Sequence, residues 1–121
     1  AVYPEEFRDE LVRIHQRYHL PIYVTENGTG LWTDKIDETG QVIDPGRIEF
    51  LDMYTKCMKE AIDQGADVRG YFIWSLLDNF EWGSGYGNRF GIIRVDFPTG
   101  RRTPKASFDW YARTIRDNRG G

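Results

Sequence analysis

The sequence predicts an α/β fold with a parallel sheet, of which it supplies only a part. Two short apolar runs, Ile22–Thr25 and Gly70–Trp74, are rich in β-branched and aromatic residues, a pattern typical of strands that are covered on both faces. Segments with helical spacing alternate with these runs, which favours helices packed on a parallel sheet. Because two strands leave both sheet edges open, we expect the chain to be a piece of a larger sheet.

Two long segments carry apolar residues at helical spacing. The first helix is predicted to begin at Pro4, because proline suits the first helical position, and Pro21 is predicted to end it. The second is predicted to have Asp44 as its N-cap, Pro45 in its first turn and Gly65 as its stop. The apolar positions of the two helices are Phe7, Leu11, Ile14 and Tyr18, and Ile48, Leu51, Tyr54, Met58 and Ile62.

The remaining segments are loops, a hairpin and a third helix. Residues 27–44 are predicted to be a loop, and residues 77–91 a second loop that is rich in glycine and aromatic residues. A small hairpin is expected over residues 92–103, with its turn at Pro98–Gly100. The last helix is predicted to open at Pro104.

The composition excludes several classes of protein. Sixteen Lys and Arg against nineteen Asp and Glu give a net charge of −3 over 121 residues, which argues against a nucleic-acid partner. Cys57 is the single cysteine, so no intrachain disulfide can form. No apolar run reaches the ~20 residues of a membrane helix, and no membrane partner is expected. The single cysteine and the lack of a recognisable signal segment favour a cytoplasmic location, although Ala1 rather than Met opens the sequence.

A carboxylate follows the first predicted strand. Glu26 comes directly after Ile22–Thr25, and reactive side chains in parallel α/β folds lie where strands end. Glu26 could therefore be directed at a substrate. The short run Thr25–Gly28, taken alone, is also typical of a turn whose glutamate is merely exposed.

A second candidate site follows the second predicted strand. Within residues 74–82, the carboxylate of Glu81 is flanked by aromatic side chains. Sugars need acceptors for their hydroxyl groups and flat rings for their C–H faces, which Glu81, Trp74 and Trp82 can supply. The alternative is that these aromatic residues belong to the core.

Three other patterns have simpler explanations. His15 and His19 are four residues apart but lack a third ligand, which favours a solvated helix face over a metal site. Cys57 is expected to be a small buried residue, because nothing evident in the sequence activates it. The run Gly83–Gly87 lacks the Lys-Ser/Thr of a phosphate loop and predicts a flexible loop at the rim of a sugar pocket.

Three stretches occur together in a recognisable order. They are Pro21–Gly28, Arg69–Trp82, and a C-terminal set made of Arg89–Gly91, Arg102–Lys105, Ser107 and Trp110. In order and spacing, Tyr3–Asn118 resembles the C-terminal quarter of the family 1 glycoside hydrolases, the family of β-glucosidases and related retaining β-glycosidases. The first stretch resembles the nucleophile motif of that family, the second its sugar-binding segment after the eighth strand, and the third its closing signature.

This resemblance implies a (β/α)8 barrel, in which residues 1–121 form the last two strands and their helices within a single domain. It implies that Glu26 is the nucleophile, that Trp74 stacks beneath the terminal sugar and that Glu81 binds its outer hydroxyls. Trp82 would donate its indole N–H to another hydroxyl, and Phe90 would line the same pocket. The implied substrate is a β-glycoside, with β-glucosides as the first expectation. No metal or organic cofactor is implied, and the protein partner would be the N-terminal portion of the barrel.

The resemblance supplies one half of a catalytic pair. Retaining glycosidases need two carboxyl groups about 5–5.5 Å apart. The acid/base of this family lies in an Asn-Glu-Pro or Thr-Glu-Pro motif, and no Glu-Pro occurs in the sequence. Two alternatives are therefore a sugar-binding fragment without catalysis and an inactive truncation. The choice among glucose, galactose and fucose stays open, because Glu81 and Trp82 serve several epimers in this family.

Overall fold

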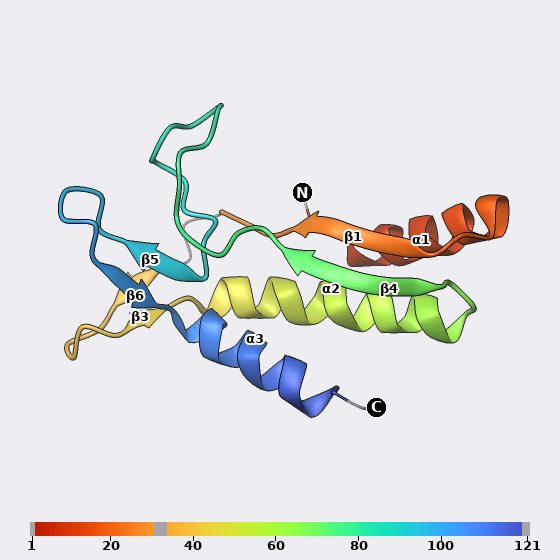
Figure 1. Cartoon of the computed structure of the whole chain (residues 1–121). Helices are drawn as coiled ribbons and strands as arrows, with labels where there is room; N and C mark the ends of the chain where they lie inside the picture. Colours follow the sequence, from red (N-terminus) through yellow and green to blue (C-terminus); the bar gives the residue numbers. More distant parts are fainter. Residues whose placement is uncertain (1, 31–33, 120–121) are drawn as a thin grey trace. The chain divides into compact units, whose positions relative to one another are not determined.

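The computed structural model describes residues 2–30 and 34–119 of the chain (Figure 1). The described residues form two compact units, residues 2–27 with 49–73, and residues 28–30 and 34–48 with 74–119. In chain order the elements are α1 (Pro4–Tyr18), β1 (Ile22–Asn27), β2 (Lys35–Ile36), β3 (Val42–Ile43), α2 (Pro45–Asp63), β4 (Val68–Ile73), β5 (Ile93–Val95), β6 (Arg102–Pro104) and α3 (Ala106–Asp117).

The first unit is built around a parallel pair of strands. β1 pairs with β4, and Ile22 lies opposite Val68 at one end while Asn27 lies opposite Ile73 at the other. The carboxyl ends of both strands therefore meet at one edge. Helices α1 and α2 both contribute to the core beside this sheet, whose buried members are Leu11, Val24, Ala61 and Ala66. This arrangement confirms the predicted α/β fold.

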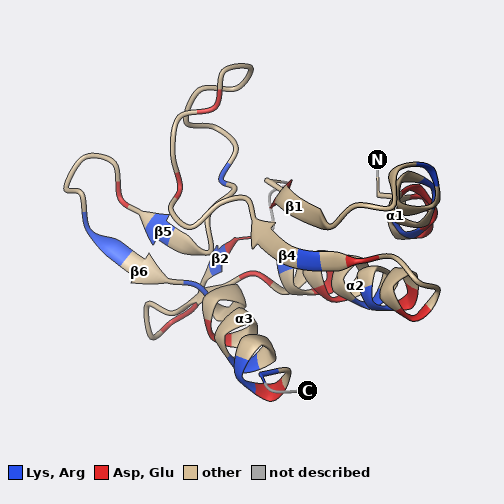
Figure 2. Cartoon of the chain, turned by 45° about the vertical axis from the view of Figure 1, so that its right-hand side comes forward, with Lys and Arg blue, Asp and Glu red and all other residues tan. Residues whose placement is uncertain are grey.

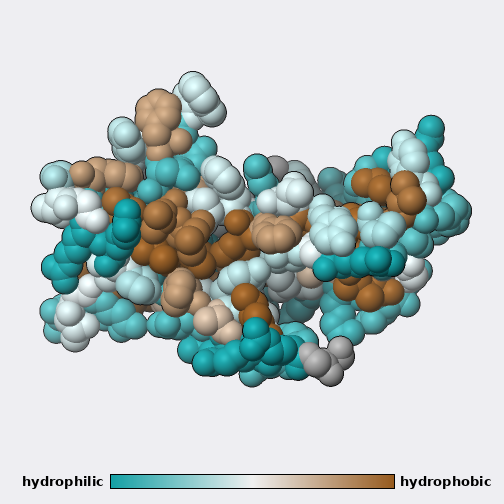
Figure 3. Space-filling view, in the orientation of Figure 1, coloured by the Kyte–Doolittle hydropathy of each residue, from teal (hydrophilic) through white to brown (hydrophobic). Residues whose placement is uncertain are grey.

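The described residues leave one face of the strand pair open, as expected for a piece of a larger sheet. The aromatic rings of Tyr23 and Phe72 are 56% and 59% exposed. Both rings lie over Gly70, because a Cβ added there would come 2.5 Å from Tyr23 and 3.5 Å from Phe72. Both helices contribute to the core on one side of the pair, and the rings of Tyr23 and Phe72 lie outside that core. Figure 3 shows in brown the hydrophobic residues that reach the surface in this view.

The two long helices follow the sequence signals closely. α1 begins at Pro4 as predicted, and Leu11 is its buried contact with the core. It ends before Pro21, because His19 adopts a left-handed conformation and caps the helix. α2 begins at Pro45, and the carbonyl oxygen of Asp44 accepts the first helical amides. Charged residues concentrate on the helices, as Figure 2 shows, and no helix of the described chain is long and apolar enough to cross a membrane.

The second unit contains two antiparallel hairpins and α3. The hairpin of β5 and β6 confirms the prediction for residues 92–103. The prediction of a plain loop over residues 27–44 is wrong, because β2 and β3 pair there across a turn that ends at Gly40 (φ 85°). The last helix begins at Ala106 rather than at Pro104, because Pro104 still belongs to β6 and pairs with Ile93.

Candidate active site

Glu26 lies near the carboxyl end of β1, in the first unit. It is exposed, and the next residue, Asn27, is the last of the strand. The hydroxyl group of Tyr71 on β4 donates a hydrogen bond of 2.7 Å to Asn27 Oδ1. This bond and the pairing of Asn27 with Ile73 fix the strand end from which Glu26 projects. A carboxylate held by a paired strand is suited to attack on a bound substrate.

Trp74 and Glu81 lie together in the second unit. The indole Nε1 of Trp74 donates to Glu81 Oε1 over 3.2 Å, and Trp74 is 38% exposed. Trp82 is 97% exposed and contacts the ring of Phe80 edge-on. The structure thus joins Trp74 and Glu81 and leaves the indole of Trp82 in solvent. The alternative that the aromatic residues of residues 74–82 belong to the core is wrong within the described chain, since Phe80 is 53% exposed and Trp74 and Trp82 are exposed too.

The glycine-rich run after Glu81 is a hydrogen-bonded turn. Glu81 and Gly85 exchange backbone hydrogen bonds of 2.8 and 2.7 Å. Gly85 has a φ of 59°, which glycine adopts without steric cost. This closed turn fixes the backbone of Glu81 on its C-terminal side.

Phe90 lies at the far end of the same loop. Its carbonyl oxygen accepts a hydrogen bond of 2.9 Å from the amide of Ser75, so the loop returns to the residue after Trp74. Its ring lies against Gly30, where an added Cβ would approach it to 2.5 Å. Gly28 allows a similar approach, because an added Cβ would come 1.8 Å from the carbonyl oxygen of Trp74. Two glycines of the 28–30 segment therefore permit its close packing on Trp74 and Phe90.

A buried carboxylate, Asp78, lies between Trp74 and Glu81 in the sequence. Its Oδ1 accepts from the amide of Gly91 at 3.0 Å and from Lys105 Nζ at 2.8 Å. Its Oδ2 accepts from Arg89 Nη1 at 2.7 Å and from the amide of Val95 at 3.3 Å. The side chain of Asp78 is fully buried, so these four donors replace the water that a carboxylate otherwise binds.

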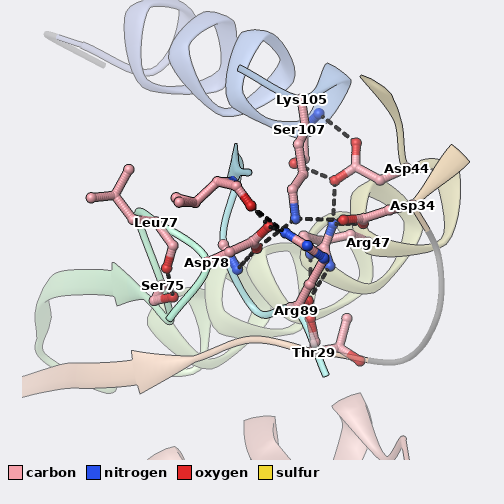
Figure 4. A network of polar contacts seen from close by, with 12 residues as sticks. Thr29, Asp34, Asp44, Arg47, Ser75, Leu77, Asp78, Arg89, Lys105 and Ser107 are labelled. Atoms are coloured by element: carbon pink, nitrogen blue, oxygen red, sulfur yellow. Dashed lines mark hydrogen bonds and ion pairs between the residues drawn. The ribbon is translucent and has the colours of Figure 1, made fainter. Parts of the chain in front are cut away.

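Asp78 belongs to a larger network of buried ions (Figure 4). Lys105 Nζ also lies 2.7 Å from Asp34 Oδ2, and Arg47 Nη1 lies 2.7 Å from Asp34 Oδ1. Burial favours a higher pKa for Asp34, but the ion pair with Lys105 and the hydrogen bond from Arg47 outweigh it and hold that pKa below its usual range. The asparagine next to Asp78, Asn79, keeps its buried Oδ1 without a hydrogen-bond partner among the described residues.

The same network fixes the starts of two helices. Asp44, just before α2, pairs with Arg47 and accepts 2.9 and 2.5 Å bonds from the amide and hydroxyl of Ser107 in α3. Arg47 Nη2 donates to the carbonyl oxygen of Arg89 at 2.6 Å. In total, three carboxylates (Asp34, Asp44 and Asp78) and three cations (Arg47, Arg89 and Lys105) balance in charge.

Sequence reasoning assigned no role to this network. Lys105 and Ser107 occur in the closing signature and Asp78 in the sugar-binding segment, yet a motif gives no contacts. The available signal was the occurrence of isolated charges in otherwise apolar or glycine-rich stretches, because charged residues are rarely buried unless they are paired.

The other candidates from the sequence, two histidines and one cysteine, lie among ordinary structural contacts. The rings of His15 and His19 meet edge-on with their centroids 5.8 Å apart. His15 Nδ1 lies 3.5 Å from the amide of Asp67, which joins the end of α1 to the start of β4. Cys57 is buried, as predicted, and burial raises the pKa of its thiol, which disfavours the reactive thiolate. The described residues contain no cluster of three or more His, Cys, Asp or Glu that could hold a metal ion.

Comparisons with known proteins agree on one family. The sequence model of glycosyl hydrolase family 1 matches residues 1–120. The chain is 45% identical over 115 residues to a 6-phospho-β-galactosidase from Lacticaseibacillus rhamnosus, covering 91% of this chain and 24% of that protein. It is 44% identical over 120 residues to a bifunctional β-D-glucosidase/β-D-fucosidase from Bifidobacterium breve, covering 95% of this chain and 26% of that protein.

Solved structures lead to the same result. A psychrophilic β-glucosidase from Micrococcus antarcticus matches with a TM-score of 0.92 and 49% identity over 98% of this chain and 25% of its own. A family 1 β-glucosidase from Thermotoga maritima, in complex with isofagomine lactam, matches with a TM-score of 0.92 and 40% identity over 97% of this chain and 27% of its own. The chain thus spans about a quarter of the length of these relatives. The described residues form an α/β piece that does not close into a barrel. The chain belongs to glycosyl hydrolase family 1 and is a fragment of a family 1 barrel.

Proposed function

We propose that this chain is part of a retaining β-glycosidase, with β-glucosides as its substrates, and that Glu26 is the nucleophile. One observation carries the proposal. The parallel pairing of β1 and β4 brings both strands to an end at one edge, with Glu26 beside the last residue of β1. Catalytic residues of parallel α/β barrels come from such strand ends. The relatives named above, which are family 1 glycosidases, support the same reaction.

The proposed reaction has two steps. The ionised carboxylate of Glu26 attacks the anomeric carbon and forms a covalent glycosyl-enzyme, while a second carboxyl group protonates the leaving oxygen. The second carboxyl group, ionised after the first step, then takes a proton from a water molecule as that water attacks the anomeric carbon. The bond between Glu26 and the sugar breaks, the sugar is released, and both carboxyl groups return to their starting forms. The second carboxyl group would come from the part of the protein outside this chain, because the sequence contains no Glu-Pro motif. Residues 1–121 would accordingly be one segment of a single barrel domain.

The proposed sugar contacts come from the loop after β4. Trp74 would offer its flat ring to the C–H face of the sugar, and Glu81 would accept hydrogen bonds from its outer hydroxyls. Their mutual hydrogen bond supports a joint role. Trp82, with a solvent-exposed indole, would donate its N–H to another hydroxyl, and Phe90 would line the pocket. Hydrogen bonds that strengthen in the transition state accelerate the reaction, whereas equal binding of ground and transition states does not.

The charges of this loop support an unphosphorylated sugar. Residues 74–91 contain one basic residue, Arg89, and its guanidinium is bound to Asp78 and to the carbonyl oxygen of Val95. Glu81, which would face the outer hydroxyls, is an acidic side chain. A phosphate group on the sugar would meet this carboxylate without a free cation in the loop. We therefore favour β-glucosides over the 6-phospho-β-galactosides that the relative from Lacticaseibacillus rhamnosus is named for.

Covalent labelling tests the assignment of Glu26. The full-length glycosidase that contains this chain is treated with a 2-deoxy-2-fluoro-β-glucoside carrying a good leaving group, and the labelled peptide is identified by mass spectrometry. We expect the label on Glu26 and none in the Glu26→Gln variant, because the amide cannot form the glycosyl-enzyme. Glu38→Gln, at an exposed turn, serves as the matched control and should label normally. A label on another carboxylate with Glu26 unmodified contradicts the proposal.

A further inference from the structure

We propose that Asp78 is a positioning residue, whose buried carboxylate holds the loop of residues 74–91 so that Glu81 and Trp74 keep the geometry that binds the sugar. The inference rests on the proposed function of Glu81 and Trp74. Asp78 itself would not touch the substrate, because its carboxylate is fully buried and occupied by protein donors.

The contacts of Asp78 tie together three separate segments. Arg89 and Gly91 belong to the returning end of the loop, Val95 belongs to β5, and Lys105 directly precedes α3. Figure 4 shows Asp78 with the Arg89 and Lys105 side chains directed toward it. Each oxygen of a carboxylate can accept about two hydrogen bonds, and both oxygens of Asp78 accept two. The carboxylate of Asp78 thus joins the loop to β5 and to the start of α3.

The backbone on each side of Asp78 is also anchored. The amide of Ser75 bonds to the carbonyl oxygen of Phe90, and the amide of Asp78 bonds to that of Ile93 at 3.1 Å. Glu81 follows three residues later and begins the closed turn with Gly85. The short link from Asp78 to Glu81 therefore determines where the Glu81 carboxylate lies relative to Trp74.

The negative charge of Asp78 matters as well as its shape. An asparagine at this position would keep one acceptor oxygen, but its NH2 group would face either Arg89 or Lys105, which are themselves donors. Two donors cannot share a hydrogen bond, and the balance of three carboxylates and three cations would be lost. We expect one end of the loop to move away from Asp78 in that variant. The displacement would reach Glu81 and Trp74 without altering either side chain.

A double-mutant cycle separates positioning from mere stability. Asp78→Asn, Glu81→Gln and the double variant are made in the full-length glycosidase, and kcat/KM for an aryl β-glucoside is measured well below the unfolding temperature of each. We expect Asp78→Asn to lower kcat/KM about tenfold in the wild-type background, on the scale of a charge-assisted hydrogen bond. In the Glu81→Gln background the same substitution should cost about threefold or less, because residues acting on one interaction are not additive.

Asp44→Asn is the matched control. Asp44 is as deeply buried as Asp78 and belongs to the same ion network, but its carboxylate binds Arg47 and Ser107 and contacts no residue of the loop itself. Its link to the loop is indirect, through the hydrogen bond from Arg47 to the carbonyl oxygen of Arg89. Its effect on kcat/KM should add to that of Glu81→Gln, even if it lowers the urea midpoint as much as Asp78→Asn does. Non-additivity of the same size for both variants would mean that general destabilisation is responsible and would overturn the inference.

Each remaining outcome is decisive. Additive effects of Asp78→Asn and Glu81→Gln overturn the role of Asp78 while leaving the proposed function intact. An unchanged kcat/KM in Glu81→Gln alone overturns the proposed sugar contact and the inference with it. If Asp78→Asn yields no folded protein, the cycle is run with Arg89→Lys, which keeps the charge but loses the donor geometry that bridges Asp78 and Val95. Additivity of that variant with Glu81→Gln likewise overturns the inference.

Discussion

The indole N–H of Trp74 donates a hydrogen bond to Oε1 of Glu81, with the two atoms 3.2 Å apart. This bond joins the first residue after β4 to a carboxylate seven positions later, and it leaves the second oxygen of Glu81 for other donors. A flat ring and an acceptor are thereby fixed side by side. Sugar hydroxyls and C–H faces require that combination.

Removal of the Glu81 carboxylate should weaken turnover of glucosides. In Glu81→Ala, we expect kcat/KM for an aryl β-glucoside to fall at least tenfold, because a charge-assisted hydrogen bond contributes about 1.5–3 kcal/mol. The value of kcat should fall too, since these bonds tighten as the sugar ring distorts. The measurement is steady-state kinetics of the full-length enzyme, with Glu38→Ala as an exposed acidic control. Equal kinetics for Glu81→Ala and wild type would show that Glu81 points away from the sugar.

The charge of the loop should also determine the substrate class. We expect a higher kcat/KM for an aryl β-glucoside than for its 6-phosphate, because Glu81 repels a phosphate and Arg89 is bound to Asp78. Replacing Glu81 by Gln should narrow the ratio between the two substrates, as the repulsion disappears. Parallel assays with both substrates measure this ratio. A preference for the phosphorylated substrate would contradict the proposed substrate class.

Gly91 should tolerate no side chain. A Cβ there would lie 2.3 Å from the amide nitrogen of Asp78 and 2.5 Å from the carbonyl carbon of Leu77, so the buried backbone would have to separate. We expect Gly91→Ala to lower the free energy of unfolding by about 1–3 kcal/mol, as overpacking does. Gly83→Ala is the control, because nothing lies within 4 Å of the added Cβ. Its effect in urea unfolding should stay within about 0.5 kcal/mol, and similar losses for both variants would count against this packing argument.

The sequence predicted the regular elements of the first unit well. Pro4 and Pro45 begin helices, and the apolar runs at Ile22 and Tyr71 become paired strands, because these signals are local. The rings of Tyr23 and Phe72 look like core residues in the sequence, but their burial depends on cover that the described chain does not provide.

The candidate site was predicted in type rather than in geometry. Glu26, Trp74 and Glu81 follow from their positions after strands and from the family motifs, and the roles assigned to them stay predictions. The ion network could not be derived in the same way, because Asp44 and Ser107 are 63 residues apart in the sequence. No spacing rule links such distant residues. The β2–β3 hairpin could not be predicted for another reason. Its strands are two residues long, and the apolar pattern of so short a strand cannot be distinguished from that of a loop.

The ion pairs of Asp34 with Arg47 and Lys105 should make the free energy of unfolding depend on pH. Burial alone would raise the pKa of Asp34, but the ion pair with Lys105 and the hydrogen bond from Arg47 outweigh it and lower that pKa in the folded state below its ordinary value of 3.8. The unfolded state therefore binds a proton more readily. The stabilisation is present above pH 3.8 and is lost as the pH falls through the folded pKa.

The corresponding measurement compares wild type with Asp34→Asn in urea from neutral pH down to about pH 3. We expect the wild type to be more stable at neutral pH and the difference to shrink below pH 3.8. Other carboxylates whose pKa is lowered, such as Asp37 and Asp67, are present in both proteins and cancel in the comparison. Asp63→Asn, which removes an exposed pair with Lys59, should cost about 1 kcal/mol or less. A difference for Asp34→Asn that does not change with pH would count against its ionised state.

The 121-residue chain on its own should be inactive on aryl β-glucosides. It lacks a Glu-Pro acid/base motif, and the loss of a general acid costs about 10²–10⁴-fold in rate. Its parallel sheet of two strands also leaves Tyr23 and Phe72 exposed, and exposed strand edges pair readily with other strands.

We expect co-expression with the rest of the barrel to restore activity, and Glu26→Gln in the fragment to abolish that restoration. The test assays the purified chain alone and then the co-expressed pair. Activity of the chain alone that survives repurification and disappears in Glu26→Gln would contradict the requirement for a second carboxyl group.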